Sequence, residues 1–281
     1  MIFRNALKII FLGLFTVSLS CTKVIHEKDL FYPRHLPILS DEVVRTNTSI
    51  MVEDTISLRG WFIHSPSYKR SLIYFYGNGE NVYDSSVPLY WLATNLKCNI
   101  LAMDYRGYGV SDGKPSFNSL LADGIKIYDF LVDSLGQSPA ATFVYGRSIG
   151  TLPAVHVASQ KPVSGLILQA PPTSAAEIIP RWKSLAPWYI RWILRVRPDK
   201  DLKNYHPQPV EDIRKVAAPL LIIHGTEDDI IPIDFGRRMF EEAGSKQKRW
   251  CPVKGYGHNN LRIYDSPISD SLRAFVNPHG D

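Results

Sequence analysis

The residues best suited to chemistry lie in a short glycine-bounded segment at 146–150, Gly-Arg-Ser-Ile-Gly. This G-x-S-x-G pattern can hold a serine hydroxyl on a sharp strand-to-helix turn, where glycines such as Gly146 and Gly150 avoid collisions with neighbouring backbone. The pattern also occurs by chance, so its value depends on context. Here an apolar run precedes it at 142–145 and a helical pattern follows it. Ser148 is therefore the candidate nucleophile.

A serine hydroxyl becomes a good nucleophile only when a neighbouring base removes its proton, and histidine is the usual base. His258 follows a predicted strand and a glycine-rich stretch at 253–257, which makes it the preferred base among the eight histidines. An acidic group should orient that histidine. The apolar run 220–224 ends in an acidic turn holding Glu227, Asp228 and Asp229. Composition does not choose among these three.

The elements that must position these residues alternate along the chain. Seven short apolar runs are predicted to be strands: 58–64, 72–76, 99–104, 142–145, 165–169, 220–224 and about 249–253. Amphipathic stretches between them are predicted to be helices: about 86–96, 118–135, 149–159, 233–243 and 267–276. Strands that are apolar on both faces suit a parallel sheet covered by helices on both sides. The sequence thus predicts one α/β domain over 22–281 with a mostly parallel central sheet.

Four blocks, in order, resemble the serine aminopeptidase-like and acyl-thioesterase-like branch of the α/β-hydrolase family. They are Tyr-Phe-Tyr-Gly-Asn-Gly-Glu-Asn at 74–81, Asp-Tyr-Arg-Gly-Tyr-Gly-Val-Ser-Asp-Gly at 104–113, Gly-Arg-Ser-Ile-Gly at 146–150, and the pair His-Gly-Thr-Glu-Asp at 224–228 with Gly-Tyr-Gly-His at 255–258. The resemblance implies the α/β-hydrolase fold with a short lid insertion. It also implies that Asp228 is the acid, with Asp229 the main rival and Glu227 facing solvent.

Acyl transfer builds negative charge on the substrate oxygen, and preorganised N–H groups must meet it. In this fold one N–H comes from the residue after the nucleophile, here Ile149. The resemblance assigns the second to Asn78, although the segment could instead be a plain turn. Tyr76 stands where similar proteins have histidine, so the loop is expected to be anchored differently. Asp104 and Arg106 are expected to be structural.

Residues 171–210 are the predicted lid insertion. They hold three tryptophans, Trp182, Trp188 and Trp192, and seven basic residues against three acidic ones. One interpretation is an amphipathic lid that covers an acyl pocket or rests on a membrane interface. The other is a surface helix with an aromatic core face and a solvated basic face.

The N-terminus resembles an export signal. Arg4 and Lys8 precede an uncharged run at 9–22 that is too short to cross a bilayer as a helix. The residues before Cys21 resemble a bacterial lipoprotein signal, which predicts lipidation of Cys21 and a lipid-anchored cell-envelope protein. Plain secretion, with the mature protein periplasmic or released, and a retained anchor or buried helix are the alternatives.

Composition removes several classes of function. The net charge of +5 is mild and no basic run appears, so nucleic acid is not an expected partner. Three cysteines without a CxxC pair suggest neither a disulfide framework nor a zinc site. A dehalogenase or epoxide hydrolase would need a carboxylate where Ser148 stands.

The expected function is cleavage of carboxylic ester or thioester bonds through a Ser-His-Asp acyl-enzyme mechanism, with no metal or organic cofactor. The expected substrate is a small-molecule or lipid-like acyl compound, and membrane association through Cys21 is a further expectation. A serine peptidase of the aminopeptidase type is one alternative, and the basic lid counts against it. A non-catalytic binding protein on the same fold is the other. The sequence makes no prediction about the oligomeric state.

Overall fold

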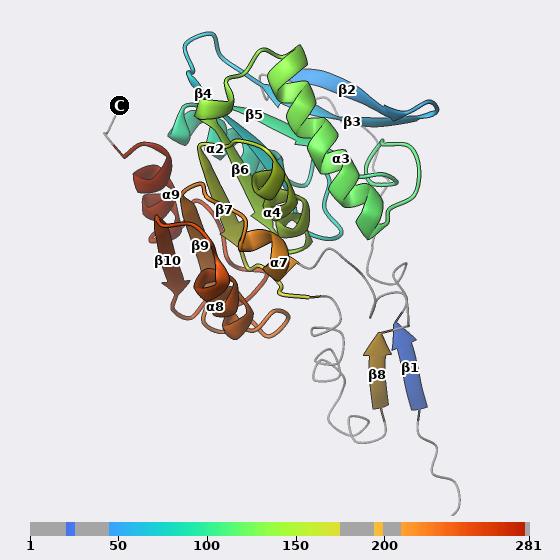
Figure 1. The fold of residues 1–281 in the computed structure, drawn as a ribbon, viewed down its shortest axis with the longest axis vertical. Coiled ribbons are helices and arrows are strands. Elements are labelled where there is room, and N and C mark those ends of the chain that lie inside the picture. Colours follow the sequence, from blue (N-terminus) through green and yellow to red (C-terminus); the bar gives the residue numbers. More distant parts are fainter. Residues whose placement is uncertain (1–20, 26–44, 175–193, 199–208, 279–281) are drawn as a thin grey trace, which may run out of the picture.

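The computed structural model describes residues 21–25, 45–174, 194–198 and 209–278 (Figure 1). Its centre is an eight-stranded sheet in the order β10-β9-β7-β6-β4-β5-β3-β2. All neighbouring pairs are parallel except those of β3, which runs against both β2 and β5. The strands are β2 (Thr46–Glu53), β3 (Ile56–Ile63), β4 (Arg70–Phe75), β5 (Cys98–Met103), β6 (Thr142–Arg147), β7 (Gly165–Gln169), β9 (Leu220–Gly225) and β10 (Lys248–Val253).

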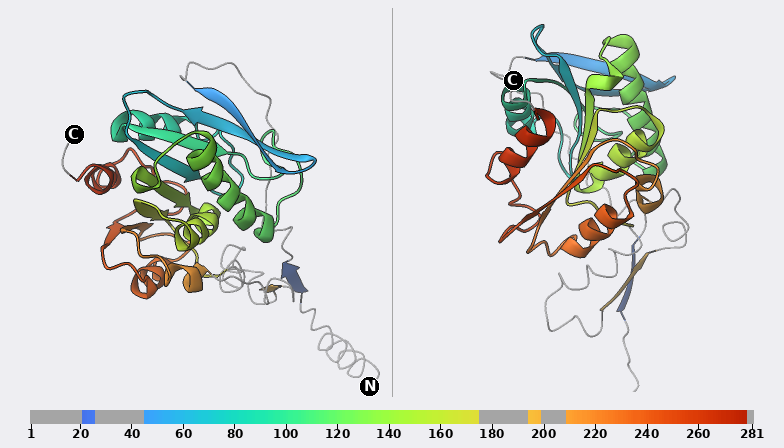
Figure 2. Two further views of the ribbon diagram at one scale, coloured as in Figure 1. Left: turned by 45° about the horizontal axis from the view of Figure 1, so that its top comes forward. Right: turned by 60° about the vertical axis from the view of Figure 1, so that its left-hand side comes forward.

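Helices cover both faces of this sheet (Figure 2). On one face α2 packs beside α9, and on the other α3 packs beside α4, with α7 next to α4 and α8 next to α7. Their bounds are α2 (Ser86–Leu96), α3 (Phe117–Asp129), α4 (Thr151–Gln160), α7 (Pro209–Ile213), α8 (Ile233–Glu242) and α9 (Ile268–Val276). The predicted layering, a mostly parallel sheet between two layers of helices, is confirmed.

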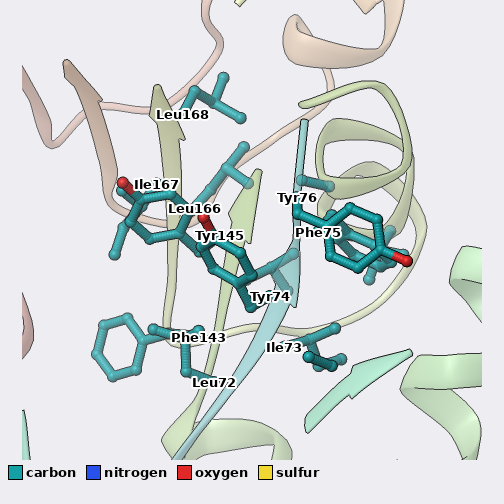
Figure 3. Packing of buried hydrophobic residues seen from close by; sticks show 14 of the residues in the cluster. Leu72, Ile73, Tyr74, Phe75, Tyr76, Phe143, Tyr145, Leu166, Ile167 and Leu168 are labelled. Carbon is teal, nitrogen blue, oxygen red and sulfur yellow. The ribbon is translucent and has the colours of Figure 1, made fainter. Parts of the chain in front are cut away.

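The core is built on the central strands, because their side chains are apolar on both faces. Leu72, Ile73 and Val144 are fully buried. The rings of Tyr74 and Tyr145, on neighbouring strands, lie 5.1 Å apart on one side of the sheet (Figure 3). These buried strands give the loops that carry the predicted site residues a rigid base at the carboxyl edge of the sheet.

All seven predicted strands are present, with ends that differ by at most two residues. Strand β2 was not among them, since its residues Thr-Asn-Thr-Ser-Ile-Met-Val-Glu are mostly polar and largely exposed. It is an edge strand with one neighbour, so it needs apolar side chains on one face alone. The predicted helix 118–135 ends at Asp129 and continues as a wider π-helical turn over Phe130–Ser134.

A second, two-stranded sheet joins β1 (Cys21–Ile25) to β8 (Leu194–Pro198) in parallel, with Cys21 opposite Leu194. Within the predicted lid, the structure describes β8, residues 171–174 and residues 209–210, which open α7. Trp182, Trp188 and Trp192, and residues 1–20 of the predicted signal at 1–21, lie outside the described residues. Among the described residues, no helix is both long and apolar enough to span a membrane.

Candidate active site

The predicted nucleophile lies on a tight turn between β6 and α4. Ser148 has a φ of +52°, in the left-handed region that a residue with a side chain rarely adopts. A Cβ on Gly146 would lie 2.5 Å from the carbonyl oxygen of Gly150, and one on Gly150 would lie 2.2 Å from that of Phe75. Both glycines are therefore required for the turn, and the turn lifts the Ser148 hydroxyl off the end of its strand.

The structure brings Ser148, His258 and Asp228 together, although they come from three separate segments. His258 Nε2 lies 3.0 Å from Ser148 Oγ, and His258 Nδ1 lies 2.7 Å from Asp228 Oδ2. His258 and Asp228 are buried, whereas Ser148 is half-buried. The imidazole thus bridges a hydroxyl and a carboxylate in one continuous hydrogen-bonded chain.

The Asp228 carboxylate accepts three close hydrogen bonds and lies near a second imidazole, that of His224, whose Nε2 is closer to the Ile231 carbonyl oxygen (2.8 Å). Its Oδ1 accepts the backbone N–H groups of Ile230 (3.0 Å) and Ile231 (2.7 Å), and its Oδ2 faces His258 and, at 3.5 Å, His224. Burial alone would raise the pKa of Asp228, but the hydrogen bonds from His224 and His258 outweigh it, and the pKa lies well below its usual range.

An ionised carboxylate can only accept hydrogen bonds, so His258 must carry its proton on Nδ1, facing Asp228. Its Nε2 then presents a lone pair to the Ser148 hydroxyl. This is the tautomer that a general base needs, and it follows from the charge of Asp228.

The loops carrying Asp228 and His258 are joined to each other. The N–H of Glu227 donates to the carbonyl of Tyr256 at 2.9 Å, and the N–H of Gly255 donates to Thr226 Oγ1 at 3.0 Å. A Cβ on Gly225 would lie 2.2 Å from the Tyr256 carbonyl oxygen, so the approach requires glycine there. The spacing between Asp228 and His258 is therefore fixed by backbone contacts.

The predicted oxyanion residues flank the nucleophile. Ile149 follows Ser148 directly in the turn at Ser148–Gly150. The loop after β4 approaches from the other side, since a Cβ on Gly77 would lie 3.7 Å from Ser148 Cβ. The side chain of Asn78 is tied back, because its Oδ1 accepts from the Tyr108 hydroxyl at 2.7 Å.

Tyr76 anchors this loop from below. Its hydroxyl donates to Asp104 Oδ1 at 2.8 Å and accepts the N–H of Tyr105 at 3.1 Å, and the Tyr105 hydroxyl returns to the Tyr76 carbonyl at 2.7 Å. Asp104 is fully buried, and this burial raises its pKa to about 6. The expected change of anchor at Tyr76 is thus a tyrosine–aspartate contact.

The contacts of Asp104 and Arg106 suit the structural role expected of them. Arg106 donates through two nitrogens to Asp123 on α3, each at 2.7 Å, and through a third to Glu53 on β2. The arginine therefore joins the turn at 104–113 to a helix and an edge strand.

Sequence reasoning assigned no role to His224, Gln169, Arg147 or Glu80, which make contacts near the site. His224 Nε2 lies 2.8 Å from the Ile231 carbonyl oxygen and 3.5 Å from Asp228 Oδ2. Gln169 accepts from the Tyr145 hydroxyl at 2.5 Å and donates to the Leu261 carbonyl at 2.7 Å, which ties β6 to the loop following His258. Arg147 pairs with Glu80. Gln169 and Leu261, like Glu80 and Arg147, lie so far apart along the chain that no sequence pattern joins them.

The rival acids do not share the position of Asp228. Glu227 and Asp229 are both exposed, whereas Asp228 is buried.

Cys21, the predicted lipidation site, is the first residue of β1. In the described part of the chain, no three His, Cys, Asp or Glu side chains are grouped as a metal site would require.

Comparison with known proteins identifies the family. Residues 69–212, about half of the chain, match the serine aminopeptidase (S33) family. The chain is 33% identical over 217 residues to the alpha/beta hydrolase domain-containing protein 17C of Xenopus laevis, covering 75% of this chain and 63% of that protein. It is equally identical to protein 17B of Xenopus tropicalis, covering 68% of that protein.

The fold has solved counterparts. An esterase of Pyrococcus furiosus, Pf2001, superposes with a TM-score of 0.69 over 88% of this chain and 98% of that one, at 17% identity. At such a low identity the superposition shows the fold alone. This fold agrees with the family assigned from the sequence. The chain therefore belongs to the serine aminopeptidase (S33) family and has the α/β-hydrolase fold.

Proposed function

We propose that this protein is a serine hydrolase that cleaves carboxylic ester or thioester bonds through an acyl-enzyme. The observation that supports this most directly is the single imidazole hydrogen-bonded to Ser148 on one side and to Asp228 on the other. The buried, ionised Asp228 gives His258 the tautomer of a base. Nucleophile, base and orienting acid are thus within reach of one another before any substrate binds.

The reaction proceeds in two halves. Ser148 Oγ attacks the acyl carbonyl while His258 Nε2 takes the hydroxyl proton, and the carbonyl oxygen becomes an oxyanion beside the N–H groups of Ile149 and Asn78. His258 then gives its proton to the departing alcohol or thiol, leaving an ester on Ser148. Water, deprotonated by the same imidazole, attacks that ester; the bond to Ser148 Oγ then breaks, His258 returns the proton to Oγ, and the acid is released. Asp228 stabilises the imidazolium in both halves.

The test compares the wild-type chain with Ser148→Ala. Both are treated with a fluorophosphonate probe and then assayed on nitrophenyl esters and acyl thioesters of increasing chain length. We expect labelling and turnover in the wild type and neither in the variant, with the preferred chain length reporting the size of the acyl pocket. Equal turnover by the two proteins, or no labelling of the wild type, would refute the proposal.

Aminopeptidase activity is a second candidate, because the matching family carries that description. That activity requires acidic residues that bind the free ammonium group of the substrate, whereas the predicted lid is rich in basic residues. Aminoacyl nitroanilides tested beside the esters separate the two. Turnover confined to the nitroanilides would favour the peptidase.

We also propose that the protein is exported and lipid-anchored through Cys21. The supporting feature is the positive, then apolar, sequence that leads to this cysteine. When the protein is expressed in the presence of radiolabelled fatty acid, the wild type should become labelled. It should also be recovered in the membrane fraction. Cys21→Ser should remain unlabelled, and equal labelling of both would contradict the proposal.

A further inference from the structure

An ion pair joins the nucleophile turn to the oxyanion loop. Arg147 lies between Gly146 and Ser148, and its Nη1 donates to Oε1 of Glu80, which lies three residues after Gly77. Both side chains are mostly sheltered, with 18% of Arg147 and 27% of Glu80 exposed. Such a pair is less screened by solvent than a fully exposed one.

The same carboxylate also holds the loop backbone. Its second oxygen, Oε2, accepts the N–H of Gly77 at 3.3 Å and the hydroxyl of Ser85, at the start of α2, at 3.5 Å. One side chain therefore connects β6, the loop after β4 and the N-terminal end of a helix.

Gly77 is surrounded by these groups and by the nucleophile. A Cβ there would lie 3.5 Å from Arg147 Nη1, 3.7 Å from Glu80 Oε1 and 3.7 Å from Ser148 Cβ. The next residue is Asn78, whose side chain is fixed on the other side by Tyr108. The peptide that carries the proposed oxyanion N–H is thus held from both ends.

We propose that Glu80 and Arg147 are positioning residues whose ion pair holds the Gly77–Asn78 backbone beside Ser148, so that the oxyanion N–H is aimed before the substrate arrives. This inference rests on the proposed ester hydrolysis. Preorganised donors stabilise the transition state because no reorganisation is needed as the charge develops, and small displacements of such groups cost rate. Loss of the pair should therefore lower kcat and leave ground-state binding unchanged.

A double-mutant cycle tests the pair in the full-length chain. Glu80→Ala removes both the ion pair and the acceptor for Gly77, and we expect kcat on a nitrophenyl ester to fall about tenfold to a hundredfold, with KM within about twofold. Glu80→Gln keeps an acceptor for the Gly77 N–H and should lose about threefold to tenfold. Arg147→Met should resemble Glu80→Gln. The double variant Glu80→Ala/Arg147→Met should be no worse than Glu80→Ala, because the two residues act as one unit.

The matched control breaks a different ion pair. Glu242→Gln removes the partner of Arg214, which lies 2.6 Å away in a more exposed pair, and kcat should stay within about twofold of wild type because exposed pairs contribute little. The proposal is overturned by a Glu80→Ala kcat within twofold of wild type, by losses that simply add in the double variant, or by a change confined to KM. If Glu80→Ala does not fold, Glu80→Gln and Arg147→Met carry the test.

A second measurement does not depend on turnover. Hydrogen exchange at the amides of Gly77 and Asn78 should be about tenfold faster in Glu80→Ala than in wild type and unchanged in Glu242→Gln. A wild type that hydrolyses no ester but shows this difference would refute the proposed function and retain the positioning role. Exchange that is unaffected by Glu80→Ala in an active enzyme would refute the positioning role alone.

Discussion

Asp104 and Asp228 occupy comparable places and behave in opposite ways. Both follow strands, β5 and β9, at the same carboxyl edge of the sheet, and both are buried, with 0% and 6% of the residue exposed. Burial raises the pKa of Asp104 to about 6, whereas the pKa of Asp228 lies well below its usual range because hydrogen bonds from His224 and His258 outweigh burial.

The difference lies in the partners. Asp104 accepts from a tyrosine hydroxyl and from the backbone of Val82, and these neutral donors do not outweigh the cost of burying its charge. Asp228 accepts two backbone N–H groups and faces two imidazoles, of which His258 becomes a cation during the proposed reaction. At this edge of the sheet, Asp228 is the carboxylate that the proposed reaction requires to be ionised. Asp104 accepts hydrogen bonds that hold the loop after β4 in place.

The largest expected contrast is in catalysis. In Asp228→Asn the amide can donate to His258 Nδ1, which favours the tautomer with its proton on Nε2 and removes the base that faces Ser148. We expect kcat to fall by about 10³–10⁴, the order seen for such changes in serine hydrolases. Asp104→Asn keeps an acceptor for Tyr76 and should stay within about tenfold of wild type. Steady-state kinetics on one nitrophenyl ester measures both, and equal losses would remove the distinction.

The next contrast is in the pH dependence of stability. Burial raises the folded-state pKa of Asp104 from its ordinary value of 3.8 to about 6. The protonated carboxyl therefore adds to the stability of the folded protein below pH 3.8, and this contribution is lost as the pH rises through about 6. This loss amounts to about 3 kcal/mol in the free energy of unfolding. Asp104→Asn lacks it, so the variant should gain stability relative to wild type between pH 4 and pH 7.5, as measured by urea unfolding.

Asp228→Asn is the control, because its stability relative to wild type should change with pH in the opposite direction. The pKa of Asp228 is lowered because hydrogen bonds from His224 and His258 outweigh burial, so its contribution is present above pH 3.8 and is lost as pH falls. This variant should therefore lose stability relative to wild type as pH rises from 3 to 7. Parallel trends in the two variants would contradict the proposed difference between the carboxylates.

The hydroxyl of Tyr76 is an uncharged donor to Asp104. Removing this hydroxyl should change the free energy of unfolding by less than the substitutions of the two carboxylates. In Tyr76→Phe, Asp104 loses one donor and the buried N–H of Tyr105 loses its acceptor. We expect the free energy of unfolding to fall by about 1–3 kcal/mol. Tyr128→Phe removes a hydroxyl that donates to the carbonyl of Pro162, an exposed residue, and should lower the free energy of unfolding by about 1 kcal/mol. Urea midpoints compare the two, and a larger loss at Tyr128 would contradict the role given to Tyr76.

The comparison also shows how far the sequence alone could go. Strands β4, β6, β7 and β9 were predictable because they are buried on both faces and read as apolar runs. The segments of Ser148 and His258 were found because their glycines allow backbone that other residues resist. Asp228 was singled out only by family resemblance, since three neighbouring acids have the same composition and differ in burial.

What the sequence could not give are contacts between single polar residues distant along the chain. Glu80 and Arg147 pair across 67 positions, and Tyr145 reaches Leu261 only through Gln169. Such contacts leave no periodic pattern, because each residue alone is an ordinary residue in a strand or a loop. Their partners become evident only once the order of strands in the sheet is known.

The smallest expected effect tests the neighbours of Asp228. Asp229 and Glu227 are exposed at the same turn, so Asp229→Asn and Glu227→Gln remove one charge each without touching the buried carboxylate beside His258. Charges that far into solvent are screened, and we expect kcat for both variants to stay within about twofold of wild type at 0.15 M salt. A loss near that of Asp228→Asn in Asp229→Asn would mean that Asp229 supplies the orienting charge. The low pKa of Asp228 would then reflect only its hydrogen bonds to His224 and to the backbone.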